Sequence, residues 1–196
     1  MTRRASHHDG AVAVVSVAAY CVLTARFARE PGPRERRLFT ALNDGPHGPW
    51  LRVPQQLGTP WALPVASAVL LARGRRADAL AAVAALPLVK GLEVATKKAW
   101  DRPRPLMVTP TALRDDAPVE GPSQPSGHTA IAAAATYLVA PAVPPAVAGG
   151  LAAATAAASY VRVNQGAHWP SDVVTGTFLG LGVAAGLRWG VARLLS

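Results

Sequence analysis

Short polar segments divide the chain into six apolar stretches. Each stretch is near the roughly 17–25 residues that a helix needs to cross a bilayer. The six run over residues 10–28, 57–72, 77–100, 126–140, 146–163 and 172–195. We therefore predict an all-α fold, an integral-membrane bundle of six transmembrane helices. It would form a single domain over residues 1–196 that begins with a polar N-terminal tail at residues 1–9.

Two of the segments between these stretches are too polar to span a membrane. Residues 31–56 are rich in Pro, Gly and Arg, with a short amphipathic piece that suits a membrane interface, formed by Leu38, Phe39 and Leu42. Residues 101–125 contain six prolines and are predicted to be a loop. With six spans, this loop and residues 164–171 emerge on one membrane face, and both termini lie on the other.

One pair of charged residues lies inside a predicted span. Lys90 and Glu93 are three positions apart in the third stretch, so they can pair on one helical face. Charges at this depth are costly and must face the bundle interior or a partner. We favour a structural ion pair, with a place on a substrate path as the alternative.

The composition supports a membrane location and argues against nucleic acid as a partner. Hydrophobic residues make up 51% of the chain and charged residues only 16%, below the roughly one quarter of soluble domains. The net charge of +9 comes from basic residues that flank the apolar stretches, as membrane topology produces. The bilayer is therefore the expected partner, and nothing indicates an obligate protein partner. The single cysteine, Cys21, cannot form an internal disulfide.

The unusual polar residues gather at the helix ends that share one predicted membrane face. They are Lys97, Arg104, Ser126, Gly127, His128, Arg162, His168 and Asp172. Two histidines and an aspartate can provide a nucleophile, an acid and an orienting group. Because His168 and Asp172 are four positions apart, Asp172 could accept the imidazole N–H and fix its tautomer.

The remaining members of this group suit a phosphate anion. Arginine donates two parallel hydrogen bonds to phosphate. Residues 125–128 open a predicted helix, where free backbone N–H groups attract anions and Gly127 permits close approach. Cations around one carboxylate argue against a divalent metal, and the zinc signature H-E-x-x-H is absent. We therefore expect no metal and no cofactor.

At these positions the sequence resembles the type 2 phosphatidic acid phosphatase superfamily, which includes bacterial lipid phosphatases and the vanadium haloperoxidases. The signature of that superfamily is K-x6-R-P, then P-S-G-H, then S-R-x5-H-x3-D. The chain matches it with Lys97 through Arg104-Pro105, with Pro125-Ser126-Gly127-His128, and with Arg162 through His168 to Asp172. Every spacing holds, and the one departure is Val161 in place of the serine. The motifs cover residues 97–172, and the six-span layout extends the resemblance over nearly the whole chain.

The resemblance implies a role for each matched residue. His168 would be the nucleophile that forms a phosphohistidine, Asp172 would orient it, and His128 would protonate the leaving alcohol and later activate water. The phosphoryl oxygens would be held by Lys97, Arg104, Ser126, Gly127 and Arg162. Lys98 and Arg102 offer alternative registers for the first motif, but only Lys97 with Arg104 satisfies both its spacing and its proline.

The expected activity is that of a metal-independent membrane lipid phosphatase. Its substrate would be phosphatidic acid, phosphatidylglycerol phosphate or a polyprenyl phosphate or diphosphate. Alternatives are a lipid phosphotransferase, a vanadate-dependent haloperoxidase-like enzyme and a non-enzymatic lipid-binding membrane protein. Basic residues at 3, 4, 73, 75, 76 and 193 favour cytoplasmic termini and an extracytoplasmic site in a bacterial-type plasma membrane, although residues 26–52 carry six arginines on the site's side.

Overall fold

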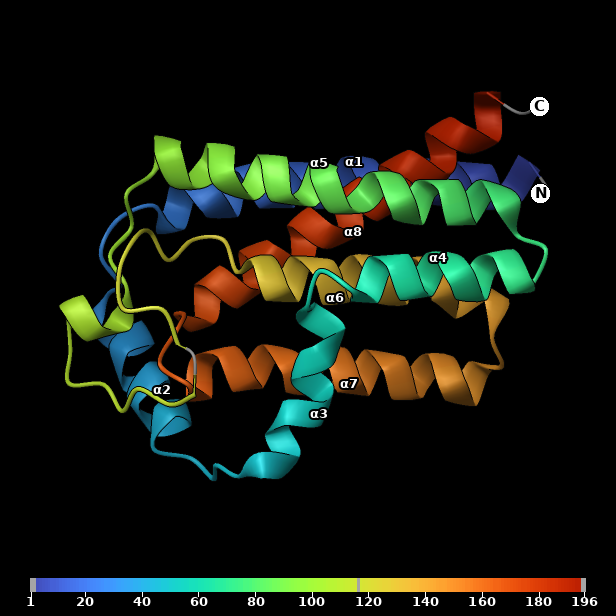
Figure 1. The fold of residues 1–196 in the computed structure, drawn as a ribbon. Helices are drawn as coiled ribbons and strands as arrows, with labels where there is room; N and C mark the ends of the chain where they lie inside the picture. The colour runs from blue at the N-terminus through green and yellow to red at the C-terminus, as the bar shows by residue number, and fades with distance from the viewer. Residues whose placement is uncertain (1–2, 116, 195–196) are drawn as a thin grey trace.

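A bundle of helices running side by side makes up most of the structure (Figure 1). The computed structural model describes residues 3–115 and 117–194. Within these residues there is no β-strand, which confirms the predicted all-α class. The bundle helices are α1 (Arg3–Phe27), α4 (Ala62–Ala72), α5 (Arg76–Ala99), α6 (Gly127–Val139), α7 (Pro145–Asn164) and α8 (Pro170–Leu194).

The smaller elements lie outside the bundle (Figure 1). They are α2 (Pro33–Asn43), η1 (Pro49–Leu51), α3 (Arg52–Gln55), η2 (Gln56–Gly58) and η3 (Pro105–Met107), while η4 (Ala140–Ala142) follows α6. Of these, α2 is at the end of the bundle away from the two chain termini, and α3 lies alongside α7 (Figure 1). The amphipathic piece predicted near Phe39 is α2. Its Phe39 ring is fully buried, with its centroid 4.9 Å from that of Trp169, so α2 packs on the link between α7 and α8.

Four helices are long and apolar enough to cross a membrane: α1 from His7, α5, α7 and α8. The other two apolar stretches form shorter helices, because α4 has 11 residues and α6 has 13. At about 1.5 Å per residue, neither covers a hydrocarbon core of about 30 Å. The predicted count of six full spans is therefore not confirmed.

Prolines lie close to three of the four ends of these short helices: Pro60 before α4, Pro125 before α6 and Pro141 after α6. Thr59 precedes Pro60 and is extended, with φ −77° and ψ 156°, so α4 starts only at Ala62. This is the conformation that a following proline imposes. Ser126 follows Pro125 and is also extended, and Pro141 lies in η4 just beyond the last turn of α6.

Helix α6 occupies the middle of the bundle (Figure 1) and is buried over most of its length. It packs against α4, α5, α7 and α8. Its closest neighbour is α8, where a Cβ atom added to Gly180 would overlap the Ala130 carbonyl oxygen. Small residues allow helix backbones to approach in this way. His128 lies in the first turn of α6 and Asp172 in the first turn of α8, so the close packing of these two helices holds both residues on one rigid pair.

The segment predicted as a polar tail is part of the first helix, since α1 already begins at Arg3. Asp9 is buried there, and its carboxylate pairs with the Arg188 guanidinium on α8. The Tyr137 hydroxyl donates to the same carboxylate at 2.8 Å. Because these polar groups satisfy one another, the start of α1 can be packed into the bundle.

Candidate active site

A cavity of about 270 Å³ lies among the helix ends and loops. Six of the eight predicted site residues line it, and they come from α5, the loop after it, α6 and the end of α7 with the link that follows. These six are Lys97, Arg104, Gly127, His128, Arg162 and His168. Its volume is below the roughly 300–1,000 Å³ of a pocket for a drug-sized ligand, so it has room only for a smaller group.

His168 lies on the tight link between α7 and α8, with Asp172 behind it in the first turn of α8. Gly166 makes this link possible because its φ of +81° is in the left-handed region that favours glycine. The Nδ1 atom of His168 is 3.6 Å from the Asp172 Oδ2 atom, and both side chains are buried. This pairing leaves Nε2 as the imidazole nitrogen available to the cavity.

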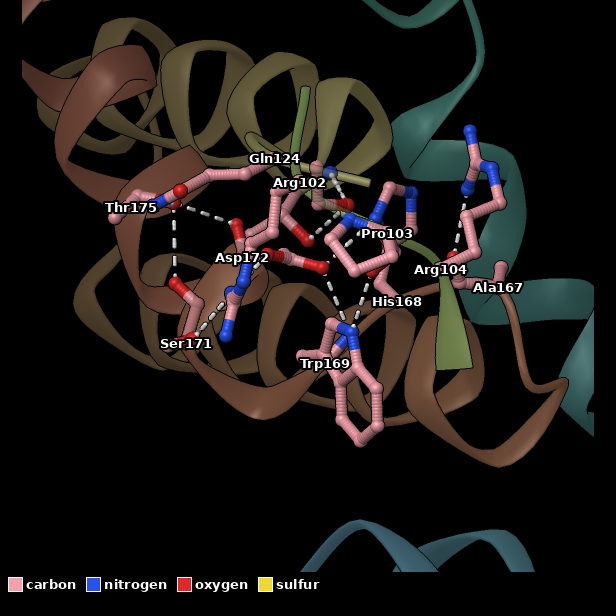
Figure 2. A network of polar contacts seen from close by, with 12 residues as sticks. Arg102, Pro103, Arg104, Gln124, Ala167, His168, Trp169, Ser171, Asp172 and Thr175 are labelled. Carbon is pink, nitrogen blue, oxygen red and sulfur yellow. Dashed lines mark hydrogen bonds and ion pairs between the residues drawn. The ribbon is translucent and has the colours of Figure 1, made fainter. Parts of the chain in front are cut away.

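The Asp172 carboxylate is held from several sides. Its Oδ2 atom accepts a hydrogen bond of 2.8 Å from the Trp169 backbone N–H. The Trp169 indole N–H in turn donates to the Pro103 carbonyl at 2.9 Å, as Figure 2 shows. The Asp172 carbonyl accepts from the Ser126 backbone N–H at 3.0 Å, which ties the start of α8 to the start of α6.

Burial lowers the pKa of His168 to about 4. The nearby Asp172 carboxylate opposes this effect, while Arg162 and Arg104 add to it. Since the imidazolium form is the one that burial disfavours, His168 is uncharged at neutral pH. An uncharged imidazole keeps the lone pair that a nucleophile needs.

The two site arginines are oriented by carbonyl and amide oxygens. The Arg104 guanidinium donates to the carbonyls of Glu120 at 2.8 Å and Ala167 at 2.7 Å. The Arg162 guanidinium donates to the Gln165 side-chain oxygen at 2.7 Å. Each arginine is only 5% exposed, yet both line the cavity. They therefore present fixed positive charge to an anion inside it.

Lys90, Glu93 and Lys97 on α5 form a network of two ion pairs, which is another part of the cavity wall. The Glu93 carboxylate accepts from Lys90 at 2.6 Å and from Lys97 at 2.7 Å. The predicted pairing of Lys90 with Glu93 is confirmed. Both residues also line the cavity, so the pair is part of the site as well as of the helix. Glu93 is the single carboxylate among the lining residues.

At the start of α6, Gly127 lines the cavity, whereas Ser126 lies behind it and caps the helix. Gly127 packs so closely on Glu93 that a Cβ atom would overlap the carboxylate. Ser126 is fully buried and does not line the cavity. Its Oγ atom accepts from the Thr129 hydroxyl at 3.1 Å and from the Thr129 N–H at 3.5 Å, so it caps the helix.

Val161, which replaces the motif serine, is fully buried and absent from the cavity wall. Ser159 does not substitute for the missing hydroxyl, because its Oγ donates to the Thr155 carbonyl at 2.8 Å. The helix therefore contributes Arg162 to the site without a neighbouring hydroxyl from either position.

Arg102 is a residue of the site region whose contacts the sequence does not reveal. Motif spacing makes it only an alternative register for Arg104. In the structure it is fully buried and bonded to Asp172, Ser171 and Glu35 (Figure 2 shows the first two).

Among the described residues, no group of three or more His, Cys, Asp or Glu side chains is placed to hold a metal ion.

Comparisons with known proteins identify similar folds. The LpxE structure from Aquifex aeolicus is similar in fold, with a TM-score of 0.68 and 22% identity over 77% of this chain and 92% of that one. The first transmembrane PAP2 type phosphatidylglycerolphosphate phosphatase from Bacillus subtilis also has a TM-score of 0.68. It is 20% identical over 94% of this chain and 97% of that one. No curated protein sequence matches the chain.

The sequence model of the PAP2 superfamily matches residues 78–195. That match covers more than half of the chain and includes all three motifs and every predicted site residue. The chain belongs to the PAP2 superfamily.

Proposed function

We propose that this protein is a membrane lipid phosphatase that hydrolyses a phosphomonoester or diphosphate of a lipid through a phosphohistidine, without a metal. One observation carries the proposal. A buried imidazole backed by a carboxylate, His168 with Asp172, opens into a cavity whose wall also holds His128 and several cations. Fixed positive charge around a positioned nucleophile is the main requirement of phosphoryl transfer.

The reaction proceeds in two displacements on phosphorus. His168 Nε2 attacks the phosphorus atom while the bond to the leaving oxygen breaks, and His128, which must be in its imidazolium form for this step, gives that oxygen a proton and becomes neutral. The imidazolium that forms is stabilised by Asp172. A water molecule then loses a proton to His128 and attacks the phosphohistidine, which releases inorganic phosphate and regenerates His168. Lys97, Arg104, Arg162 and the start of α6 would hold the phosphoryl oxygens throughout.

An apolar groove next to the cavity supports a lipid as the substrate. Gly58 and Pro60 are part of the cavity wall, while Leu57, Thr59 and Trp61 line a groove of about 630 Å³ that reaches Val65 and Ala154. The two share one short segment of chain, so a headgroup in the cavity would place a hydrocarbon chain along the groove. The structurally similar Bacillus subtilis protein is a phosphatidylglycerolphosphate phosphatase, which supports a phosphate monoester of this kind.

The site would face the extracytoplasmic side of a bacterial-type plasma membrane. Arg73, Arg75 and Arg76 lie in and beside the α4–α5 turn, at the same end of the bundle as both termini (Figure 1). Short basic turns of this kind mark the cytoplasmic side. The cavity residues come from the opposite ends of the same helices.

Phosphate release from a panel of lipid phosphates tests this function directly. Detergent-purified protein is assayed in excess EDTA, beside His168→Ala and the control His8→Ala, whose histidine side chain is 72% exposed on α1. We expect activity that survives EDTA, persists in His8→Ala, and falls by about 10³-fold or more in His168→Ala. Hydrolysis that persists in folded His168→Ala would exclude His168 as the nucleophile, and loss in EDTA alone would exclude the metal-free mechanism.

A further inference from the structure

Arg102 is a fully buried arginine on the loop behind the cavity. One terminal nitrogen of its guanidinium, NH1, donates to the Asp172 Oδ1 atom and to the Ser171 hydroxyl, the latter at 2.7 Å. The other, NH2, donates to the Glu35 carboxylate at 2.8 Å, and Nε donates to the Arg29 carbonyl at 3.2 Å. All three guanidinium nitrogens are thus engaged, on partners from three separate segments.

Burial of a charged guanidinium requires interactions that compensate for the loss of its hydration. Taking an arginine out of water is costly unless well-placed hydrogen bonds and charges compensate. Here two carboxylates, Glu35 and Asp172, flank one guanidinium. Glu35 also accepts from the Ser171 backbone N–H at 3.1 Å, so α2 is attached to the same first turn of α8 that contains Asp172. The network converges on the carboxylate next to His168.

The two carboxylate oxygens of Asp172 have different partners, and this difference explains what the network does. Arg102 holds Oδ1, while Oδ2 receives the Trp169 N–H and lies 3.6 Å from His168 Nδ1. Rotation of the carboxylate away from the imidazole would therefore break the contacts with Arg102 and with the Trp169 N–H. Lysine could supply the charge but not the planar fork that reaches several acceptors at once.

We propose that Arg102 is a positioning residue that fixes the Asp172 carboxylate for His168, and that Glu35 in turn holds Arg102. The proposal rests on the proposed phosphohistidine mechanism, because it assigns Arg102 an effect on the attack step. Arg102 itself does not line the cavity, so it acts through Asp172 and not on the substrate.

A double-mutant cycle on kcat tests this coupling. We expect Arg102→Lys to lower kcat by about 10- to 100-fold while KM changes by less than about threefold, as for second-layer partners of other functional side chains. In an Asp172→Asn background the same change should alter kcat by less than about twofold, since the carboxylate that it positions is gone. Equal losses in both backgrounds, or an unchanged kcat in folded Arg102→Lys, would overturn the proposal.

A matched control separates positioning from general stability. Arg188 also bonds to a buried carboxylate, Asp9, but at the other end of the bundle. Arg188→Lys should lower the melting temperature and leave kcat within about twofold of wild type.

If Arg102→Lys does not fold, Glu35→Gln replaces it in the double-mutant cycle. This variant should lower kcat in the wild-type background alone, and an equal loss beside Asp172→Asn would again refute the coupling.

A measurement without turnover distinguishes failure of this proposal from failure of the proposed function. Nitrogen-15 NMR of labelled histidine reports which imidazole nitrogen carries the proton. His168 should be Nδ1-protonated in wild type and Arg188→Lys, and should become a tautomer mixture in Arg102→Lys. If wild type releases no phosphate but this tautomer shift occurs, the phosphatase function fails and the positioning role stands. An unshifted tautomer in folded Arg102→Lys removes the positioning role even if the enzyme is active.

Discussion

His168 is both buried and part of the wall of a cavity lined by cations. Burial and the nearby cations both disfavour the protonated imidazolium. Asp172 alone among its close charged neighbours favours the protonated form. The same side chain can therefore be neutral before attack and stabilised as a cation after it. The balance between burial and Asp172 is what sets its acid–base behaviour.

This balance predicts an unusual titration. We expect the His168 imidazole signal, followed by NMR in detergent, to titrate near pH 4 and not near the ordinary 6.5. Because the unfolded chain takes up this proton at higher pH, acidification from about 6.5 to 4 should also reduce the free energy of unfolding. Asp172→Asn removes the one group that raises the pKa of His168, so its midpoint should move lower still. A midpoint at or above 6.5 would contradict the burial argument.

The sequence predicts the residues of the cavity wall better than the residues behind it. Motif spacing identifies Lys97, Arg104, His128, Arg162 and His168, and all five line the cavity. Arg102 has no such signature, because its partners Glu35 and Asp172 lie far away in the chain and become neighbours only on folding. Ser126 shows the converse, as a motif position whose hydroxyl caps a helix in the structure.

Helix packing is set by the glycines that bring α6 and α8 together. Gly176 and Gly180 face the α6 backbone so closely that a Cβ atom on either would overlap a carbonyl oxygen, that of Ser126 or Ala130. The sixth apolar stretch carries glycines at positions 176, 180, 182, 186 and 190, and several of them are four apart, a spacing that indicates closely packed membrane helices. The length of α4 is less accessible, because the predicted apolar stretch over residues 57–72 continues through Pro60 whereas the helix begins only at Ala62.

Replacing one of these glycines should disturb the bundle at its centre. Gly180→Ala forces the α6 backbone away from α8, and overpacking of this kind costs about 1–3 kcal/mol. We expect a lower melting temperature in detergent and reduced activity, since His128 lies two residues before Ala130. Gly190→Ala is the control: it has open space around it and should be neutral or stabilising by up to about 1 kcal/mol. Equal melting temperatures for the two variants would refute the close contact.

The whole bundle is polarised along its length. One end has the proline-rich loop and α2, and the other has both termini and the α4–α5 turn (Figure 1). The cavity is lined by residues near the first of these ends, such as Lys97, Arg104 and His168. If the cavity is the active site that we propose, substrate and product are exchanged at one membrane face. Which face that is decides which pool of lipid the enzyme can reach, and the arginines around residue 75 favour cytoplasmic termini.

Cysteine labelling of intact cells tests this orientation. In a Cys21→Ser background, single cysteines replace Met107, which is 66% exposed near the cavity end, or Pro144, which is exposed between η4 and α7. Neither change alters the charges that set topology. A membrane-impermeant maleimide should label Met107→Cys in intact spheroplasts, and Pro144→Cys only after permeabilisation. The reverse pattern would place the cavity in the cytoplasm, where the six arginines of residues 26–52 would then be the dominant topology signal and the enzyme would draw on lipid from the inner leaflet.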